Sequence, residues 1–266
     1  MSCHEADRLD RLSYLDSPAH RLDPRAKLLA TLAFVVAVVS FPKYEVSALT
    51  PFVFFPLLLA GAGGIPLGLI ARRVAIVSPF AIMIGLFNPL LDRAPGVLLG
   101  PVALAAGWIS FASILVRFAL TMSAALVLTA TTSFPALCQG LTGLRVPRAF
   151  VVQLLFLYRY LFLLAEESGR LRRARDLRGI GARGRTLRVA AAAMGVLFTR
   201  TLDRAERIYQ AMAARGFDGT VRQLRTLRFC RADALFLAGV AGGALALRLL
   251  PVTSWLGSLG TGGTGR

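Results

Sequence analysis

Residues 148–178 read RAFVVQLLFLYRYLFLLAEESGRLRRARDLR, and this stretch decides the fold that the sequence predicts. It predicts one long helix, which at 1.5 Å a residue would extend about 46 Å. The first half is apolar on most faces, whereas the second half is mostly charged. We therefore expect the helix to begin against or within a membrane and to end in water. The pattern leaves open whether residues 150–165 enter the bilayer.

A second long helix is predicted over residues 187–215, after a turn with the sequence GIGARGR. Its apolar residues recur at steps of three and four, which is typical of an amphipathic helix. They are Val196, Leu197, Leu202, Ala205, Ile208, Tyr209 and Met212. The two helices predict a cytoplasmic module of long coupling helices.

Both predicted helices end in an arginine that is followed by a glycine. Arg178 precedes Gly179, and Arg215 precedes Gly216. Each glycine is expected to stop its helix in the left-handed conformation, which costs glycine nothing. A cation in the last turn interacts favourably with the helix dipole, by about 0.3–1 kcal/mol. Capping alone would account for one such arginine.

A functional alternative is that the two helix ends insert into partner proteins. Ala213 and Ala214 precede Arg215, and small residues let another backbone approach closely. A guanidinium group at such a position can clamp a carboxylate through two parallel hydrogen bonds. The residues by themselves do not choose between a capping role and an interface role.

The composition indicates a polytopic membrane protein. Hydrophobic residues make up 56% of the 266 residues, against about 45–50% in ordinary soluble domains. The mean hydropathy is +0.63. Several apolar runs are long enough, or nearly so, for the ~20 residues that a span requires.

The charge is concentrated in one block. The net charge is +17, and residues 166–231 hold sixteen arginines against six acids. Such a block beside membrane spans is expected on the cytoplasmic side, where it could meet anionic lipids or an acidic protein surface. No aromatic platform or recognised motif accompanies the arginines, so nucleic acid is not expected as a partner.

The predicted fold class is all-α, with about five transmembrane helices and the cytoplasmic coupling-helix module. The chain divides into a cytoplasmic N-terminal lead, a transmembrane region of about four helices, the module, a last transmembrane helix and a flexible tail. Their residues are 1–27, 28–131, 132–231, 232–250 and 251–266. Within the lead, Asp23 is expected to cap a helix that starts at Pro24, and Lys27 is expected to snorkel.

Four apolar runs in the transmembrane region predict the spans, at 28–41, 46–63, 74–91 and 108–131. Arg72 and Arg73 predict an inside loop before the third run. The Gly- and Pro-rich residues 94–107 predict an outside loop or hairpin. Arg117 lies within the fourth run, where a charge is by default a functional hypothesis. The alternative is that Arg117 snorkels or pairs with a neighbouring loop.

Three stretches resemble the transmembrane T component of energy-coupling factor (ECF) transporters, most of all the CbiQ type of cobalt and nickel uptake systems. They are LDPRAKLL at 22–29, YRYLFLLAEESGRLRRARDLRGIGAR at 158–183 and LDRAERIYQAMAARGFDG at 202–219. The resemblance extends over about residues 12–250.

The Ala-Arg-Gly signature of that family is matched once in full and once in part. Ala214, Arg215 and Gly216 match it residue for residue. The first copy is Leu177-Arg178-Gly179, with leucine in place of alanine. An alternative register is Ala174-Arg175-Asp176, and Arg178 is favoured because a glycine follows it.

The resemblance implies a non-catalytic transporter subunit. Two cytoplasmic ABC-type ATPase subunits would each receive one signature arginine in a groove. A CbiM-like membrane subunit would capture the substrate, and membrane lipids would surround the assembly. Cobalt is the first expectation for the substrate, nickel the second and a vitamin the third.

Other chemistry finds little support in the residues. No GxxxxGK[ST] loop is present, so the chain cannot bind ATP by a P-loop. No metal site is expected, because Cys3 and His4 alone cannot fill a four-ligand site. No catalytic residue is expected, because no buried carboxylate pair or Ser–His arrangement stands out, and no cofactor is expected. The acids, Glu166 and Glu167 among them, are interpreted as caps and ion-pair partners. A membrane-embedded enzyme and a scaffold that binds anionic lipid are the alternatives.

Overall fold

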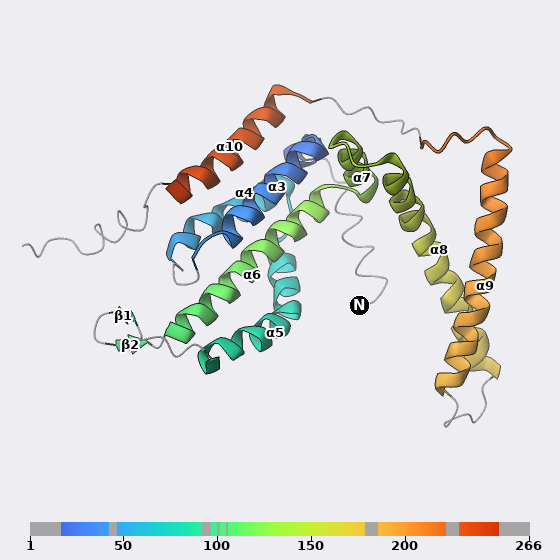
Figure 1. Ribbon diagram of the computed structural model, residues 1–266, viewed down its shortest axis with the longest axis horizontal. Helices are drawn as coiled ribbons and strands as arrows, with labels where there is room; N and C mark the ends of the chain where they lie inside the picture. The colour runs from blue at the N-terminus through green and yellow to red at the C-terminus, as the bar shows by residue number, and fades with distance from the viewer. Residues whose placement is uncertain are drawn as a thin grey trace, which may run out of the picture. The chain divides into compact units, whose positions relative to one another are not determined.

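The computed structural model describes residues 17–42, 47–91, 97–99, 102–104, 106–178, 186–221 and 229–249 (Figure 1). Nearly all of the described residues are helical, which confirms the all-α fold class. The chain forms two compact units. Unit 1 comprises Met1–Gly140 together with Leu227–Arg266, and unit 2 comprises Leu141–Thr226.

Unit 1 is a bundle in which helix α3 packs against both α6 and α10, and α6 packs also against α4 and α5. Its helices are α2 (Pro18–Arg21), α3 (Pro24–Val39), the 3-10 helix η1 (Ser47–Val53), α4 (Phe54–Gly63), α5 (Leu67–Leu91), α6 (Ala106–Thr131) and α10 (Arg231–Leu249). Strands β1 (Val97–Leu99) and β2 (Val102–Leu104) form a short antiparallel hairpin, as predicted for this segment. The core includes the stacked rings of Phe34 and Phe55, with centroids 4.5 Å apart.

Unit 2 is built on two long helices, α8 (Arg148–Arg178) and α9 (Thr186–Ala213). Helix α7 (Phe134–Gly143) precedes them at the boundary between the units. The predicted bounds of α8 and α9 agree with the structure to within two residues, because glycine- and proline-containing turns punctuate this part of the chain.

Three helices are long and apolar enough to cross a membrane: Leu67–Pro89, Gly107–Thr131 and Arg148–Ala174. The apolar stretch Ala48–Gly63 is shorter, and a 3-10 helix forms its first part. The chain is therefore a membrane protein. Arg72 and Arg73 lie inside α5 and not in the predicted loop, because the helix starts directly after Pro66. In α8, residues Arg148–Ala174 meet the length and composition of a span.

The N-terminus of α3 is capped as predicted, but Lys27 does not snorkel. Asp23 Oδ1 accepts a hydrogen bond from the Arg25 backbone N–H at 2.9 Å. The Lys27 side chain is only 1% exposed. Its Nζ donates to the Thr131 carbonyl at 3.0 Å and to Thr132 Oγ1 at 3.3 Å. The ammonium group thus satisfies a carbonyl at the C-terminus of α6, where a cation also favours the helix dipole.

Asp233 joins the N-termini of α3 and α10. Its Oδ1 accepts from the Asp23 backbone N–H and its Oδ2 from the Cys230 backbone N–H, both at 2.8 Å. The Asp233 side chain is buried. One carboxylate therefore satisfies two backbone donors that the starts of these helices would otherwise leave unpaired.

Two arginines hold the opposite end of α3. Arg117 of α6 donates to the Pro42 carbonyl at 2.6 Å. Arg248 of α10 bonds to Ser40 Oγ and lies 5.8 Å from the ring centroid of Phe41. The alternative in which Arg117 pairs with a neighbouring loop is therefore confirmed. Because the last turn of α3 has no basic residue of its own, its neighbours supply the positive charge that a helix C-terminus favours.

Candidate coupling site

The predicted site at the end of α9 is a helix C-terminus capped by backbone hydrogen bonds. Gly216 has φ +76°, the left-handed conformation that was predicted for it. The Phe217 N–H donates to the Met212 carbonyl at 3.1 Å, and the Gly216 N–H to the Ala213 carbonyl at 3.0 Å. This pair of bonds is the Schellman motif. It leaves Ala214 and Arg215 exposed at the tip.

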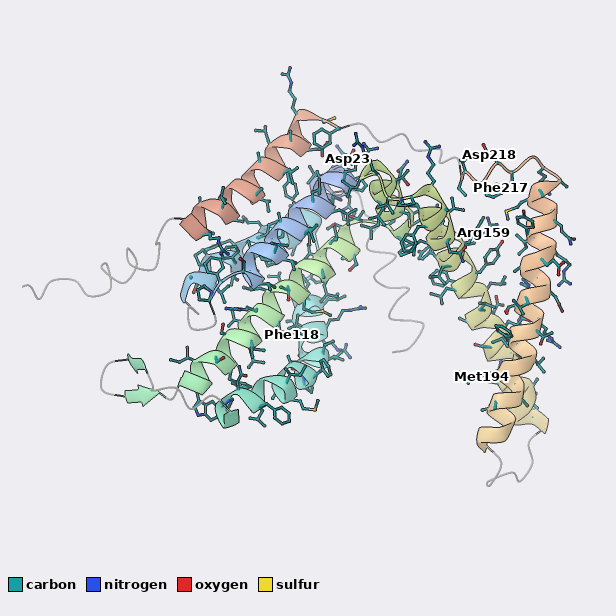
Figure 2. The ribbon with its side chains drawn as sticks, in the orientation of Figure 1. Asp23, Phe118, Arg159, Met194, Phe217 and Asp218 are labelled. Atoms are coloured by element: carbon teal, nitrogen blue, oxygen red, sulfur yellow. The ribbon has the colours of Figure 1, made fainter. Side chains whose placement is uncertain are left out.

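The residues after the tip form a second turn. Asp218 Oδ1 accepts from the Thr220 backbone N–H at 3.0 Å and from its hydroxyl at 2.6 Å. Gly219 has φ +78°, so the chain turns sharply twice within four residues. Phe217 and Asp218 lie a few residues beyond the end of α9 (Figure 2). The site is therefore an ordered tip and not a frayed helix end.

An aromatic contact holds this tip against α8. The ring centroids of Phe217 and Phe156 lie 6.4 Å apart with an interplanar angle of 50°. Such tilted pairs contribute about 0.5–1.5 kcal/mol beyond their buried area. Because Phe217 follows Gly216 directly, this contact positions Arg215 relative to α8.

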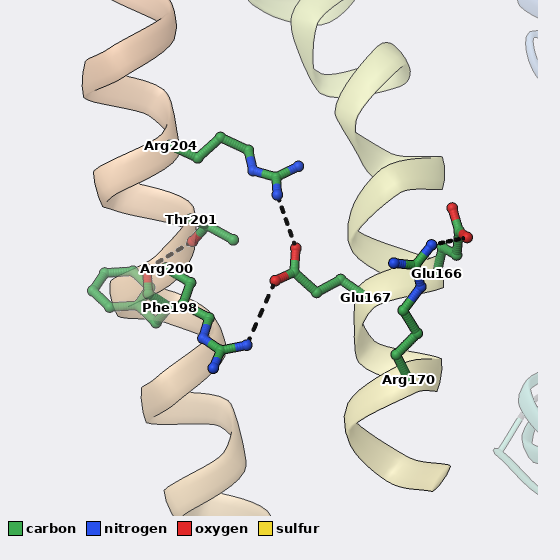
Figure 3. A network of polar contacts seen from close by, with 7 residues as sticks. All are labelled: Glu166, Glu167, Arg170, Phe198, Arg200, Thr201 and Arg204. Carbon is green, nitrogen blue, oxygen red and sulfur yellow. Dashed lines mark hydrogen bonds and ion pairs between the residues drawn. The ribbon is translucent and has the colours of Figure 1, made fainter. Parts of the chain in front are cut away.

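Ion pairs connect α8 and α9 farther along the hairpin (Figure 3). Glu167 of α8 lies 3.6 Å from Arg204 and 4.0 Å from Arg200 of α9, measured between carboxylate oxygens and guanidinium nitrogens. Its side chain is 20% exposed. Glu166 pairs instead with Arg170 of its own helix at 2.6 Å. The prediction that these two acids are ion-pair partners is confirmed, and Glu167 is the one that joins the two helices.

The contacts define an antiparallel hairpin with the two arginine motifs at opposite ends. Phe217 packs on Phe156, and Arg178 lies 22 positions after Phe156 in the same helix. At 1.5 Å a residue this distance is about 33 Å along α8. The two motifs are therefore too far apart for one small pocket to receive both.

The first motif lies partly outside the described residues. Arg178 is the last residue of α8, and Leu177 before it is 83% exposed. The side chains of Arg178 and Arg175 and the whole of Gly179 lie outside the description. The predicted helix end is confirmed, while the conformation predicted for Gly179 is untested.

The apolar stripe of α9 is only partly covered by α8. Leu197, Ile208 and Met212 are half-buried, whereas Leu202 and Tyr209 are 53% and 65% exposed. On α8, Leu157 remains 58% exposed. The hairpin thus presents apolar side chains beside its charged ends, a surface suited to a partner or to lipid.

Sequence reasoning missed two features of this site. Phe217 carried a signal, since an apolar residue after a helix-ending glycine often packs back on its helix, but the partner Phe156 could not be identified. Glu167 was recognised only as one of several acids. Within the described residues, no three His, Cys, Asp or Glu side chains converge as metal ligands would.

The comparisons with known proteins agree on one family. Residues 16–226 match the model of the CbiQ family, described as cobalt transport protein. The cobalt transport protein CbiQ of Rhodobacter capsulatus is 31% identical over 202 residues, which cover 75% of this chain and 80% of that one. The ECF transporter transmembrane protein EcfT of Thermanaerovibrio acidaminovorans is 28% identical, and the alignment covers 91% and 97% of the two chains.

The CbiQ protein of Salmonella typhimurium is 29% identical over 226 residues, or 79% of this chain and 97% of its own. The family match includes both arginine motifs and the hairpin that carries them. The chain therefore belongs to the CbiQ family, the transmembrane T components of ECF transporters.

Proposed function

We propose that this chain is the coupling subunit of an ATP-driven ECF-type metal importer. It would link two cytoplasmic ABC-type ATPase subunits to a CbiM-like membrane subunit that captures the substrate. Cobalt is the first candidate for the substrate, because relatives of this chain are named cobalt transport proteins. Nickel is the second candidate.

The observation that carries the proposal is the placement of the two arginine motifs. Arg215 is exposed on a tip that two turns and the Phe156 contact keep ordered. Arg178 ends the neighbouring helix about 33 Å away along α8. Two separate ATPase subunits could each accept one arginine, and a rigid hairpin would transmit their relative movement.

The exposed guanidinium of Arg215 suits an acidic groove on an ATPase. Arginine can bind a carboxylate through two parallel hydrogen bonds, which lysine cannot do. The chain has no P-loop sequence, so ATP hydrolysis is assigned to the partners and the chain is non-catalytic. We place the chain in the bacterial inner membrane, with its N-terminus in the cytoplasm. Although Arg148–Ala174 has the length and composition of a span, we place the coupling hairpin in the cytoplasm too, because ion pairs of Glu167 with Arg200 and Arg204 join its two helices.

Affinity purification of the tagged chain from its native membranes would test the proposal. We expect two ATPase subunits and one capture subunit to co-purify, and uptake of radioactive cobalt to need all of them. The variants Arg215→Ala and Arg178→Ala should lose ATPase while the chain still inserts. Arg207→Ala is the matched control, because Arg207 is exposed on α9 away from the tip.

Two outcomes would contradict the proposal. One is a double variant, Arg178→Ala with Arg215→Ala, that keeps its ATPases and transports at the normal rate. The other is a chain that purifies with lipid but without any ATPase, as expected for a lipid-binding scaffold.

A further inference from the structure

Unit 1 contains an open apolar groove that includes none of the residues of the two arginine motifs. The groove has a volume of about 750 Å³ and lies between α10 on one side and η1 and α4 on the other. Phe34 of α3 contributes to its floor. The groove is contained in unit 1, so all of its walls belong to one compact body.

The groove is long and apolar enough to hold a hydrocarbon chain. Its lining runs along α10 from Ala232 to Leu247, which is about 22 Å at 1.5 Å a residue. One leaflet of a bilayer is about 15 Å deep, half of the 30 Å hydrocarbon core. An acyl chain could therefore lie in the groove along the whole depth of its leaflet.

Several lining side chains remain exposed although they are apolar. Phe54, Leu58 and Leu235 are 65%, 69% and 74% exposed. Gly239 and Gly243 of α10 also line the groove, and a Cβ added at either would meet no atom within 4 Å. These glycines keep the groove open because they place no side chain in it.

One end of the groove carries exposed positive charge. Leu22 and Ala232 line this end, and their neighbours Arg21 and Arg231 are exposed. The hydrogen bond from the Asp23 N–H to Asp233 Oδ1, at 2.8 Å, brings the two segments together. Neither arginine forms an ion pair with another residue in the described part of the chain.

The two acids at this end do not face the surface. Asp23 and Asp233 are 4% and 3% exposed, and Asp233 uses both of its oxygens for backbone N–H groups. Of the cationic residues in the same segments, Arg21 and Arg231 are exposed, whereas the Lys27 ammonium group is buried against the end of α6. The mouth of the groove is therefore suited to an anion.

We propose that this groove binds one anionic phospholipid, with its phosphate between Arg21 and Arg231 and an acyl chain between α10 and α4. An apolar channel with cations at one mouth matches the two parts of such a lipid. A transmembrane helix from a partner could use the same glycines, but it would not require the two arginines at the mouth.

Native mass spectrometry of the full-length, delipidated chain in detergent tests the site. The probes are phosphatidylglycerol and phosphatidylcholine with the same acyl chains. We expect one phosphatidylglycerol to bind more tightly than phosphatidylcholine. The double variant Arg21→Gln with Arg231→Gln should lower the phosphatidylglycerol affinity about 30-fold and leave the phosphatidylcholine affinity unchanged, since each cation near a headgroup contributes a factor of about five.

A pair of glycine variants tests the groove itself. Gly243→Leu places a side chain in the groove and should abolish binding of both lipids. Gly242→Leu is the matched control, because Gly242 is exposed, lies outside the lining and has open space at its Cβ. Leucine has a higher helix propensity than glycine, so we expect both variants to fold. Circular dichroism checks this.

Three results would overturn the proposal. The first is equal affinity for the two lipids in the unaltered chain. The second is a Gly243→Leu variant that binds phosphatidylglycerol as the Gly242→Leu variant does. The third is an assembled transporter in which a partner helix fills the groove and excludes the lipid. If the Gly243→Leu variant does not fold, the Arg21→Gln/Arg231→Gln variant decides whether the site exists. Both arginines are exposed, so we expect that variant to fold.

Discussion

The ring of Phe217 packs against the ring of Phe156, with the two centroids 6.4 Å apart. Phe217 follows Gly216 at the tip of α9, while Phe156 lies in the first third of α8. The contact links the tip to α8, in addition to the hydrogen bonds within the turns of the tip. The contact gives the exposed Arg215 a defined position on the hairpin.

We expect Phe217→Ala to loosen the tip without unfolding α9. The loss of the aromatic pair should cost about 0.5–1.5 kcal/mol beyond the lost buried area. Hydrogen exchange of the amides of residues 212–218 should become faster. Phe198→Ala is the control, because Phe198 is 64% exposed on the same helix. Unchanged exchange at the tip would show that the turn alone holds it.

Arg215→Ala should weaken ATPase binding by about 2–5 kcal/mol, because a carboxylate on the partner would lose its charged hydrogen bonds. Arg215→Lys should restore only part of the affinity, since an ammonium group cannot form the bidentate contact. Titration of the purified ATPase against the chain in nanodiscs measures both effects. Full affinity in the lysine variant would argue for a simple point-charge interaction.

Gly216→Val should destabilise the helix stop. The residue has φ +76°, and a Cβ added there would meet no atom within 4 Å. The penalty is therefore conformational and should be about 1–2 kcal/mol. Gly216→Asn should cost less, because asparagine tolerates the left-handed region. A thermal melt of the two variants gives the ranking, and equal melting temperatures would contradict it.

Glu167→Gln should weaken the α8–α9 hairpin modestly. The carboxylate is 20% exposed and faces two arginines, so we expect a loss of up to about 1 kcal/mol after screening by solvent. The loss should shrink as salt is raised. Glu166→Gln is the matched control, since Glu166 pairs only within α8 among the described contacts. A salt-independent difference between the two variants would exclude an ionic role for Glu167.

Asp233→Ala should destabilise unit 1 through two stranded backbone donors. The N–H groups of Asp23 and Cys230 would lose their buried acceptor, at about 1–3 kcal/mol each. Asp233→Asn keeps one acceptor oxygen, so it should cost about half as much. Denaturant unfolding in detergent measures the series. Equal stability of the alanine and asparagine variants would mean that only one of the two bonds matters.

The local features of the chain could be predicted because their causes lie within a few residues. Asp23 before Pro24 defines the start of α3. The bounds of α8 and α9 follow from apolar periodicity and from the turns that interrupt it. The prediction that Arg72 and Arg73 lie in a loop is wrong. Arginines near the start of an apolar helix give the same sequence pattern as arginines in a loop beside it.

The sequence by itself determined the helices, their order, the membrane character and the exposed arginine at the end of α9. Only the tertiary structure decided which distant groups meet. Lys27 bonds to a carbonyl 104 residues away, and Asp233 to a backbone N–H 210 residues away. Such partners depend on how whole helices pack, since a helix carries the same local signals whichever neighbour it meets. Capping and periodicity act within one or two turns, whereas a buried charge is satisfied by whatever donor or acceptor the packed bundle brings to it.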